Sequence, residues 1–251
     1  MGKHANKHRD YDLDCHPTFI NRKKFDLKDL CSFSPKSENQ ATFIESYLNT
    51  DCDTFGLFGY PGTGKTFLAI RCGFVDVLDH DVPEYDKLII VRSAVETRDT
   101  GFKPGDETDK NMVYAKPYYG LMQDVFNLNH DKIFENLLDI GKVKFETTSN
   151  ERGVTWDNAI VVMDEVQNMT YGEIRTIYSR GGKNCRYIMC GDVGQNDLVK
   201  KSSDKSGLED WIKVMEGMGE TSITEFYSLG DIVRSGRIER MIKREIELGF
   251  V

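Results

Sequence analysis

The residues most able to do chemistry form a short glycine-rich segment, Gly-Tyr-Pro-Gly-Thr-Gly-Lys-Thr, at positions 59–66. Backbone N–H groups in such a turn point inward and bind anions, and a following helix adds its positive N-terminal end. In this pattern the lysine reaches the outer phosphates of a nucleotide, and the threonine hydroxyl is placed to bind Mg²⁺. A glycine turn without a ligand is the alternative. We predict a nucleoside triphosphate site formed by Gly59, Pro61, Gly62, Thr63, Gly64, Lys65 and Thr66.

The segments around this loop have the character that a strand–loop–helix unit requires. A β-prone run at 54–58 precedes the loop, and apolar residues at helical spacing follow it. Along the whole chain, short β-prone runs alternate with helical stretches, which is typical of a mostly parallel sheet with helices on both faces. We expect an α/β fold of the P-loop NTPase class. The predicted strands are 54–58, 88–92, 159–164, 186–190 and 222–227, with 143–146 as an edge strand, and the predicted helices are 38–48, 66–79, 117–126, 132–139, 171–179, 207–216 and 236–248.

Length and composition limit the function classes. A chain of 251 residues, 39% of them hydrophobic, can bury one substantial core, so we predict an extension at 1–32 and one ATPase domain at 33–251. The net charge of −8 excludes a surface that is basic all over, so any nucleic-acid contact would be a local patch. No apolar run reaches membrane-spanning length, and we expect a cytoplasmic protein without a membrane partner. The six scattered cysteines indicate reduced thiols, and the histidines near the N-terminus indicate a polar tail or, alternatively, a metal site.

Two adjacent acids follow the most apolar run of the chain. Residues 159–163 are continuously apolar, as in a buried parallel strand, and Asp164 and Glu165 come directly after them. Carboxylates at the carboxyl end of such a strand face the crevice in which open α/β sheets bind ligands. We therefore expect Asp164 to bind Mg²⁺ and Glu165 to orient and deprotonate an attacking water. An ordinary helix N-cap is the alternative for this pair.

Three further polar residues are candidates for the nucleotide site. Gln195 follows the strand at 186–190 and could contact the γ-phosphate or the water. Arg234 could neutralise charge that develops during phosphoryl transfer, although an exposed arginine opening a C-terminal helix is equally consistent with the sequence. Gln40 carries both a donor and an acceptor and could contact an adenine edge, or it could be a surface glutamine.

A polar loop after the strand at 88–92 indicates a surface for single-stranded nucleic acid. Its hydroxyl and basic groups could hold phosphates, and Phe102 or Tyr118 could offer a stacking face. Aromatic residues pack in cores more often than they stack on bases, so core packing is the alternative. The candidate phosphate contacts are Arg92, Ser93, Thr97, Lys103 and Arg152.

The order of these motifs resembles the PhoH family of phosphate-starvation-inducible ATPases over residues 33–248. The resemblance implies a RecA-like core similar to the first motor domain of superfamily 1 helicases, ATP with Mg²⁺, a link to single-stranded RNA or DNA, and a homo-oligomer, often a ring. It also implies roles for Gln167 and Gln195 in coupling, for Gln40 at adenine and for Arg234 at the γ-phosphate. Compact members such as this one are common in phages, which would place the protein in the host cytoplasm.

Two departures from the family pattern matter. Family members have proline after the arginine that corresponds to Arg92, whereas this chain has Ser93, and the chain lacks the additional nuclease-like or RNA-binding domain of some relatives. A single lobe would unwind strands only as an assembly of several subunits. The leading hypothesis is an Mg²⁺-dependent ATP hydrolase coupled to single-stranded RNA or DNA. A phosphotransferase and a non-catalytic ATP-binding switch are the alternatives.

Overall fold

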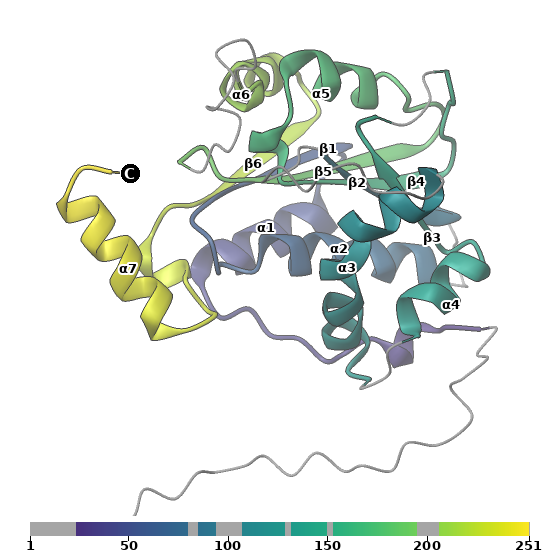
Figure 1. Ribbon diagram of the computed structural model, residues 1–251, viewed down its shortest axis with the longest axis horizontal. Helices are drawn as coiled ribbons and strands as arrows, with labels where there is room; N and C mark the ends of the chain where they lie inside the picture. The colour runs from purple at the N-terminus through teal and green to yellow at the C-terminus, as the bar shows by residue number, and fades with distance from the viewer. Residues whose placement is uncertain are drawn as a thin grey trace, which may run out of the picture.

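The computed structural model describes residues 24–79, 85–93, 107–128, 132–149, 153–194 and 206–250. Its centre is a sheet of six strands in the order β3-β2-β4-β5-β1-β6, and all the paired strands run parallel (Figure 1). The α/β class predicted from the sequence is confirmed, and every predicted strand is present. The strands are β1 (Thr54–Gly59), β2 (Lys87–Arg92), β3 (Val143–Thr147), β4 (Ala159–Asp164), β5 (Cys185–Gly191) and β6 (Thr221–Phe226).

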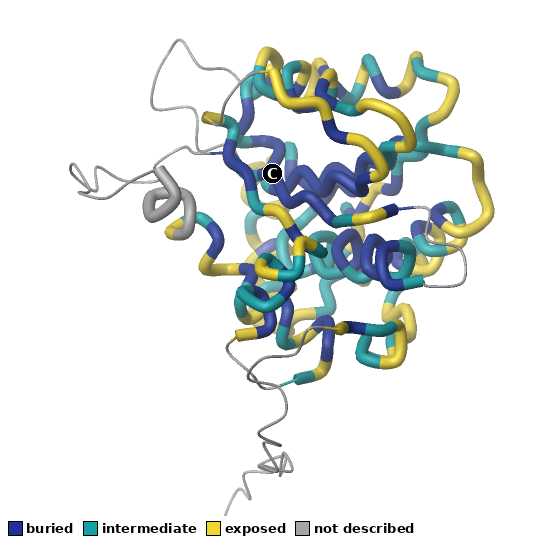
Figure 2. Tube along the Cα trace, turned by 90° about the vertical axis from the view of Figure 1, so that its right-hand side faces the viewer, coloured by how far each residue is buried: buried dark blue, intermediate teal, exposed yellow. Residues whose placement is uncertain are grey.

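Helices cover both faces of the sheet within the described residues. Figure 1 shows α1 to α4 on one face, α5 and α6 on the other, and α7 beyond one end of the sheet, outside both layers. These two layers bury two apolar clusters, one on each side of the strands, and Figure 2 shows the buried strands at the centre of the chain. The helices are α1 (Glu38–Asn49), α2 (Lys65–Leu78), α3 (Glu107–Phe126), α4 (Ile133–Asp139), α5 (Tyr171–Tyr178), α6 (Leu208–Gly217) and α7 (Gly236–Glu247).

One predicted boundary is wrong. The prediction began a helix at residue 117, whereas α3 begins at Glu107 and carries Pro117 in its interior. Proline removes one helical hydrogen bond, so a sequence pattern favours placing it at a helix start. The longer helix matters because α3 packs against α2 and β3 and carries a residue that reaches the candidate site.

Parallel topology brings the carboxyl ends of β1, β2, β4 and β5 to one edge of the sheet. β4 lies between β2 and β5, and β5 lies between β4 and β1. The loop after β1 and the acids after β4 are therefore two strands apart, which is close enough for their side chains to meet. No helix in the described part of the chain combines the length and apolar character that crossing a bilayer needs.

Candidate nucleotide-binding site

The phosphate loop joins β1 to α2 and depends on glycine backbone geometry. Gly59, Gly62 and Gly64 have positive φ angles of 149°, 79° and 86°. A Cβ atom at Gly59 would lie 2.3 Å from the carbonyl oxygen of Phe226, so no larger residue fits at that position. Gly64 is the N-cap of α2, so the loop leads directly into a helix N-terminus. The strand–loop–helix unit of an anion site is thus present.

Lys65 is the first residue of α2, and its side chain reaches back to the start of this loop. Its Nζ donates hydrogen bonds to the carbonyl oxygens of Gly59 at 2.6 Å and Tyr60 at 2.7 Å. Burial lowers the pKa of Lys65, while the nearby Cys190 and the acids at the strand ends raise it. Because the ammonium group donates only to uncharged groups, two loop carbonyls and the Thr63 hydroxyl at 3.3 Å, an entering phosphate would offer it a stronger, charged acceptor.

Thr66 follows β1 and Asp164 ends β4, and their side chains meet across β5, the one strand between them. The Thr66 hydroxyl donates to Asp164 Oδ1 at 2.8 Å, and Tyr118 of α3 donates to Asp164 Oδ2 at 2.7 Å. A threonine hydroxyl beside an aspartate is the ligand pair that P-loop NTPases use for Mg²⁺. Tyr118 is 1% exposed, so its suggested role as a stacking face is wrong. Its hydroxyl was missed as a site group because a separation of 46 positions between Tyr118 and Asp164 leaves no local sequence signal.

Glu165 lies beside this pair in a left-handed backbone conformation, with φ 54° and ψ 44°. Non-glycine residues rarely adopt this conformation, and they do so more often at functional sites. Burial raises the pKa of Glu165, and the charge of Asp164 raises it further, while Gln167, Arg92 and Lys65 lower it. A carboxylate whose pKa is raised is a stronger proton acceptor than an ordinary surface glutamate.

Gln167 connects the two acidic strand ends. Its Nε2 donates to Glu165 Oε2 at 2.5 Å, and its Oε1 accepts the Asp192 backbone N–H at 3.1 Å. Gln167 is 2% exposed and belongs to the short 3₁₀ helix η3 (Val166–Asn168). Gln167 therefore lies between the Glu165 carboxylate and the end of β5, and it fixes the position of one relative to the other.

Gln40 and Arg234 both lie against the phosphate loop. Gln40 Nε2 donates to the Thr63 carbonyl at 2.8 Å, and Gln40 Oε1 accepts the Lys36 N–H at 2.8 Å. Gln40 is 2% exposed, so the surface-glutamine alternative is wrong. The Arg234 backbone N–H donates to the Gly62 carbonyl at 3.1 Å, while its side chain is exposed. The backbone of Arg234 thus lies beside the phosphate loop of its own chain.

The candidate nucleic-acid contacts fall into two groups. Arg92 ends β2 opposite Asp164, and its charge lowers the pKa of Glu165 and of Tyr118 against the larger opposing effect of burial. Ser93 is 5% exposed and offers little surface for a phosphate. Five predicted site residues lie outside the described part of the chain, namely Thr97, Phe102, Lys103, Arg152 and Gln195.

The parallel α/β fold and the loop with its facing acid define a P-loop protein. The chain also matches the family model described as "PhoH-like protein" over residues 32–245, and it belongs to the PhoH family. It is 32% identical over 213 residues to a PhoH-like protein of Bacillus subtilis, covering 84% of this chain and 63% of that relative. It is 29% identical over 193 residues to the protein PhoH2 of the same organism, covering 76% and 43%.

The protein PhoH of Escherichia coli is 32% identical over 186 residues, which cover 73% of this chain and 50% of that relative. The chain thus spans between 43% and 63% of the length of these three relatives. The division into an extension at 1–32 and a domain at 33–251 stays a prediction.

Proposed function

We propose that this protein is an Mg²⁺-dependent ATP hydrolase. The observation that carries the proposal is the contact of Thr66 with Asp164 beside the phosphate loop, with Glu165 next in the chain. Two segments supply these groups, and Thr66 and Asp164 are 98 positions apart in the sequence, so a turn that merely needs glycine would not account for them. Family membership supports the same activity.

Each group would have a defined task. The loop N–H groups and Lys65 would bind the phosphates, and the Thr66 hydroxyl with the Asp164 carboxylate would hold Mg²⁺. Bound Mg²⁺ neutralises charge on the phosphates. Glu165 would take the proton of the attacking water, and Gln167 keeps its carboxylate in place. The Arg234 backbone lies beside the phosphate loop, so its exposed side chain would reach the γ-phosphate of a nucleotide bound to the same chain.

We further propose that hydrolysis is coupled to single-stranded RNA or DNA and that the protein acts as a homo-oligomer. Arg92 supports the first proposal, because it lies at the site edge and interacts electrostatically with Glu165. A strand phosphate that drew Arg92 away would change the charge around the proposed base. The single lobe with one phosphate loop supports the second, since unwinding needs at least two lobes to move against each other.

The deciding experiment measures phosphate release with and without single-stranded RNA or DNA. Glu165→Gln should lower the rate by about a hundredfold or more while ATP still binds. The control is Glu209→Gln, because Glu209 is exposed on α6, far from the loop in sequence, and its removal should leave the rate unchanged.

The outcomes separate the alternatives. ATP binding without phosphate release in the wild-type protein would indicate a switch. Transfer of the phosphoryl group only when a second acceptor is added would indicate a phosphotransferase. A rate that no nucleic acid changes would remove the coupling and leave the hydrolase.

A further inference from the structure

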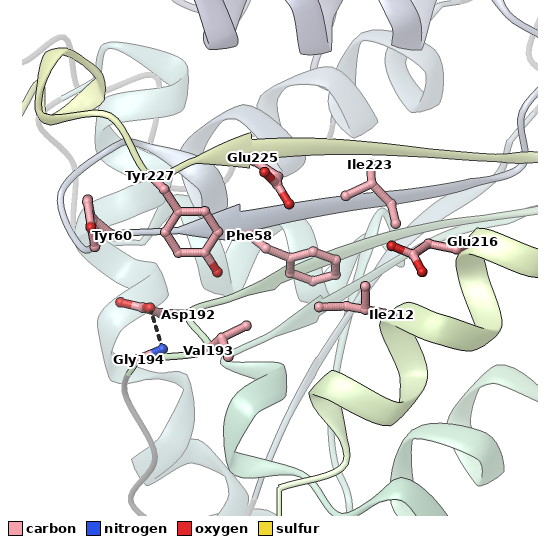
Figure 3. Close-up of a pocket in the computed structure, with 10 residues that line it drawn as sticks. All are labelled: Phe58, Tyr60, Asp192, Val193, Gly194, Ile212, Glu216, Ile223, Glu225 and Tyr227. Carbon is pink, nitrogen blue, oxygen red and sulfur yellow. Dashed lines mark hydrogen bonds between the residues drawn. The ribbon is translucent and has the colours of Figure 1, made fainter. Parts of the chain in front are cut away.

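A groove lies between α6 and the strands β1 and β6. It has a cavity volume of about 660 Å³, and Phe58, Ile212 and Ile223 form apolar walls (Figure 3). Glu216 of α6 lies at the end of the groove away from Asp192, and Glu225 lies midway along β6 between Ile223 and Tyr227. Of the ten described residues that line the groove, three are acidic and none is basic, the third acid being Asp192 at the end near the phosphate loop.

This lining indicates the chemistry of the occupant. Apolar walls require an apolar group, and the acids require positive charge beside it. Nucleic acid is disfavoured, because its phosphates would be repelled by the carboxylates of Glu216 and Glu225. A helix that carries both an apolar stripe and basic side chains fits such a groove.

α7 has this character. Residues 234–247 contain five Arg or Lys and three Glu in a chain whose net charge is −8. Ile242 is buried, and Ile238 lies beside Gly62, so one side of α7 packs on its own phosphate loop. Met241 and Leu248, in contrast, are 46% and 48% exposed.

Two exposed apolar residues on and just after α7, Met241 and Leu248, alternate with arginines, while the exposed Ile246 lies off this series. Arg237, Met241, Arg244 and Leu248 follow each other at spacings of four, three and four residues, so they form one stripe along the helix. Met241 and Leu248 are about 10 Å apart along the helix axis at 1.5 Å per residue. We define these four residues as the α7 stripe.

We propose that the α7 stripe of one copy of this chain docks in the groove of a second copy. Met241 and Leu248 enter between the apolar walls, and Arg237 pairs with one acid of the groove. Arg244 exchanges its solvent-exposed ion pair with Glu247 of its own helix, at 2.8 Å, for the other acid of the groove. The stripe cannot fill the groove of its own chain, because it is exposed while α7 is held against the phosphate loop. This docking would be the interface of the homo-oligomer proposed above. It rests on the proposed oligomer and not on the proposed ATP hydrolysis.

The interface is head-to-tail, since the groove and the stripe are different surfaces of the same chain. Such contacts form a ring when the rotation between copies closes, and a filament otherwise. Glu245 of α7 lies within electrostatic reach of Asp192 of the same chain. The end of the groove near the phosphate loop is therefore beside the chain's own α7, and the helix of the second copy enters from the Glu216 end.

Charge reversal tests the docking. The groove variant carries Glu216→Lys and Glu225→Lys, and the helix variant carries Arg237→Glu and Arg244→Glu. Light scattering after size exclusion should give an oligomer for the wild-type chain, and each variant alone should dissociate with a dissociation constant raised at least about tenfold. A mixture of equal amounts should assemble again, because each variant then meets a complementary partner.

Two controls separate docking from folding. Lys243→Glu reverses an exposed charge of α7 that is not three or four residues from any member of the α7 stripe, and it should leave the oligomer intact. Met241→Ser with Leu248→Ser changes only exposed apolar groups and should dissociate it without affecting the fold. A wild-type chain that stays monomeric, variants that keep the wild-type mass, or a mixture that fails to reassemble would each overturn the proposal. Hydrolysis by the monomeric variants would show that the proposed activity is independent of the interface.

Discussion

Replacing Tyr118 with phenylalanine tests the link between α3 and the candidate Mg²⁺ site. The substitution keeps the ring, which packs with Phe134 and Phe145, and removes only the hydroxyl that donates to Asp164 Oδ2. No cavity forms, so the loss of stability comes from the hydrogen bond alone. A hydrogen bond to a charged group contributes about 1.5–3 kcal/mol, and the buried carboxylate oxygen would lose that partner. The free energy of unfolding should fall by about this amount.

Tyr119→Phe is the matched control for Tyr118→Phe. Tyr119 is the next residue of α3, half-buried, with its ring against Phe134 at 5.1 Å between ring centroids. Its substitution should change the free energy of unfolding by no more than about 0.5 kcal/mol. Urea denaturation followed by circular dichroism measures both variants.

A second readout separates positioning from simple stability. Without the Tyr118 hydroxyl, Asp164 is less firmly oriented toward Thr66, so half-maximal phosphate release should need more Mg²⁺. Equal stability of the two phenylalanine variants would refute the hydrogen bond. Unequal stability with the same Mg²⁺ requirement would refute the positioning role while keeping the bond.

Two further substitutions and one labelling experiment test the fold. Gly59→Ala should abolish folding, because the new Cβ would lie 2.3 Å from the Phe226 carbonyl oxygen, and soluble yield with circular dichroism measures this. Burial raises the pKa of Cys72 to about 12, so native protein at about pH 8 should leave Cys72 unlabelled by iodoacetamide while the partly exposed Cys31 reacts, as read by peptide mass spectrometry. Labelling of Cys72 as readily as Cys31 would contradict that burial. Phe74→Ala should cost about 3–5 kcal/mol in urea denaturation, since Phe74 is 0% exposed, and a cost under about 1 kcal/mol would contradict its place in the core.

The parts of the site that the sequence predicts are those governed by local pattern. The loop glycines reveal a backbone that only glycine adopts, and the apolar run before Asp164 reveals a buried parallel strand. Because parallel strands end at one edge, these two local patterns also predict that Thr66 and Asp164 lie close together, and the distance of 2.8 Å confirms it. The contact of Tyr118 with Asp164 could not be predicted in this way, since Tyr118 lies in the middle of a helix rather than at a strand end.

The two buried glutamines show why a residue can be located from sequence while its partners cannot. Each side-chain amide offers two donor hydrogens and two acceptor lone pairs. Gln40 uses one of each on backbone groups of Lys36 and Thr63, which leaves one of each for an adenine edge, so that prediction stays open. The side-chain amide of Gln167 likewise makes two hydrogen bonds, one to the Glu165 carboxylate and one to the Asp192 backbone.

Both amides thus join a site element to backbone that the sequence places far away. Gln40 of α1 bonds to the phosphate loop. Gln167 of η3 connects the proposed base, Glu165, to the backbone at the end of β5. A base that must take a proton in a fixed direction gains from such support, because less reorganisation remains for the reaction step. Glu165 combines this support of its carboxylate with a left-handed backbone, an unfavourable conformation of the kind that persists at functional sites where the surrounding structure determines it.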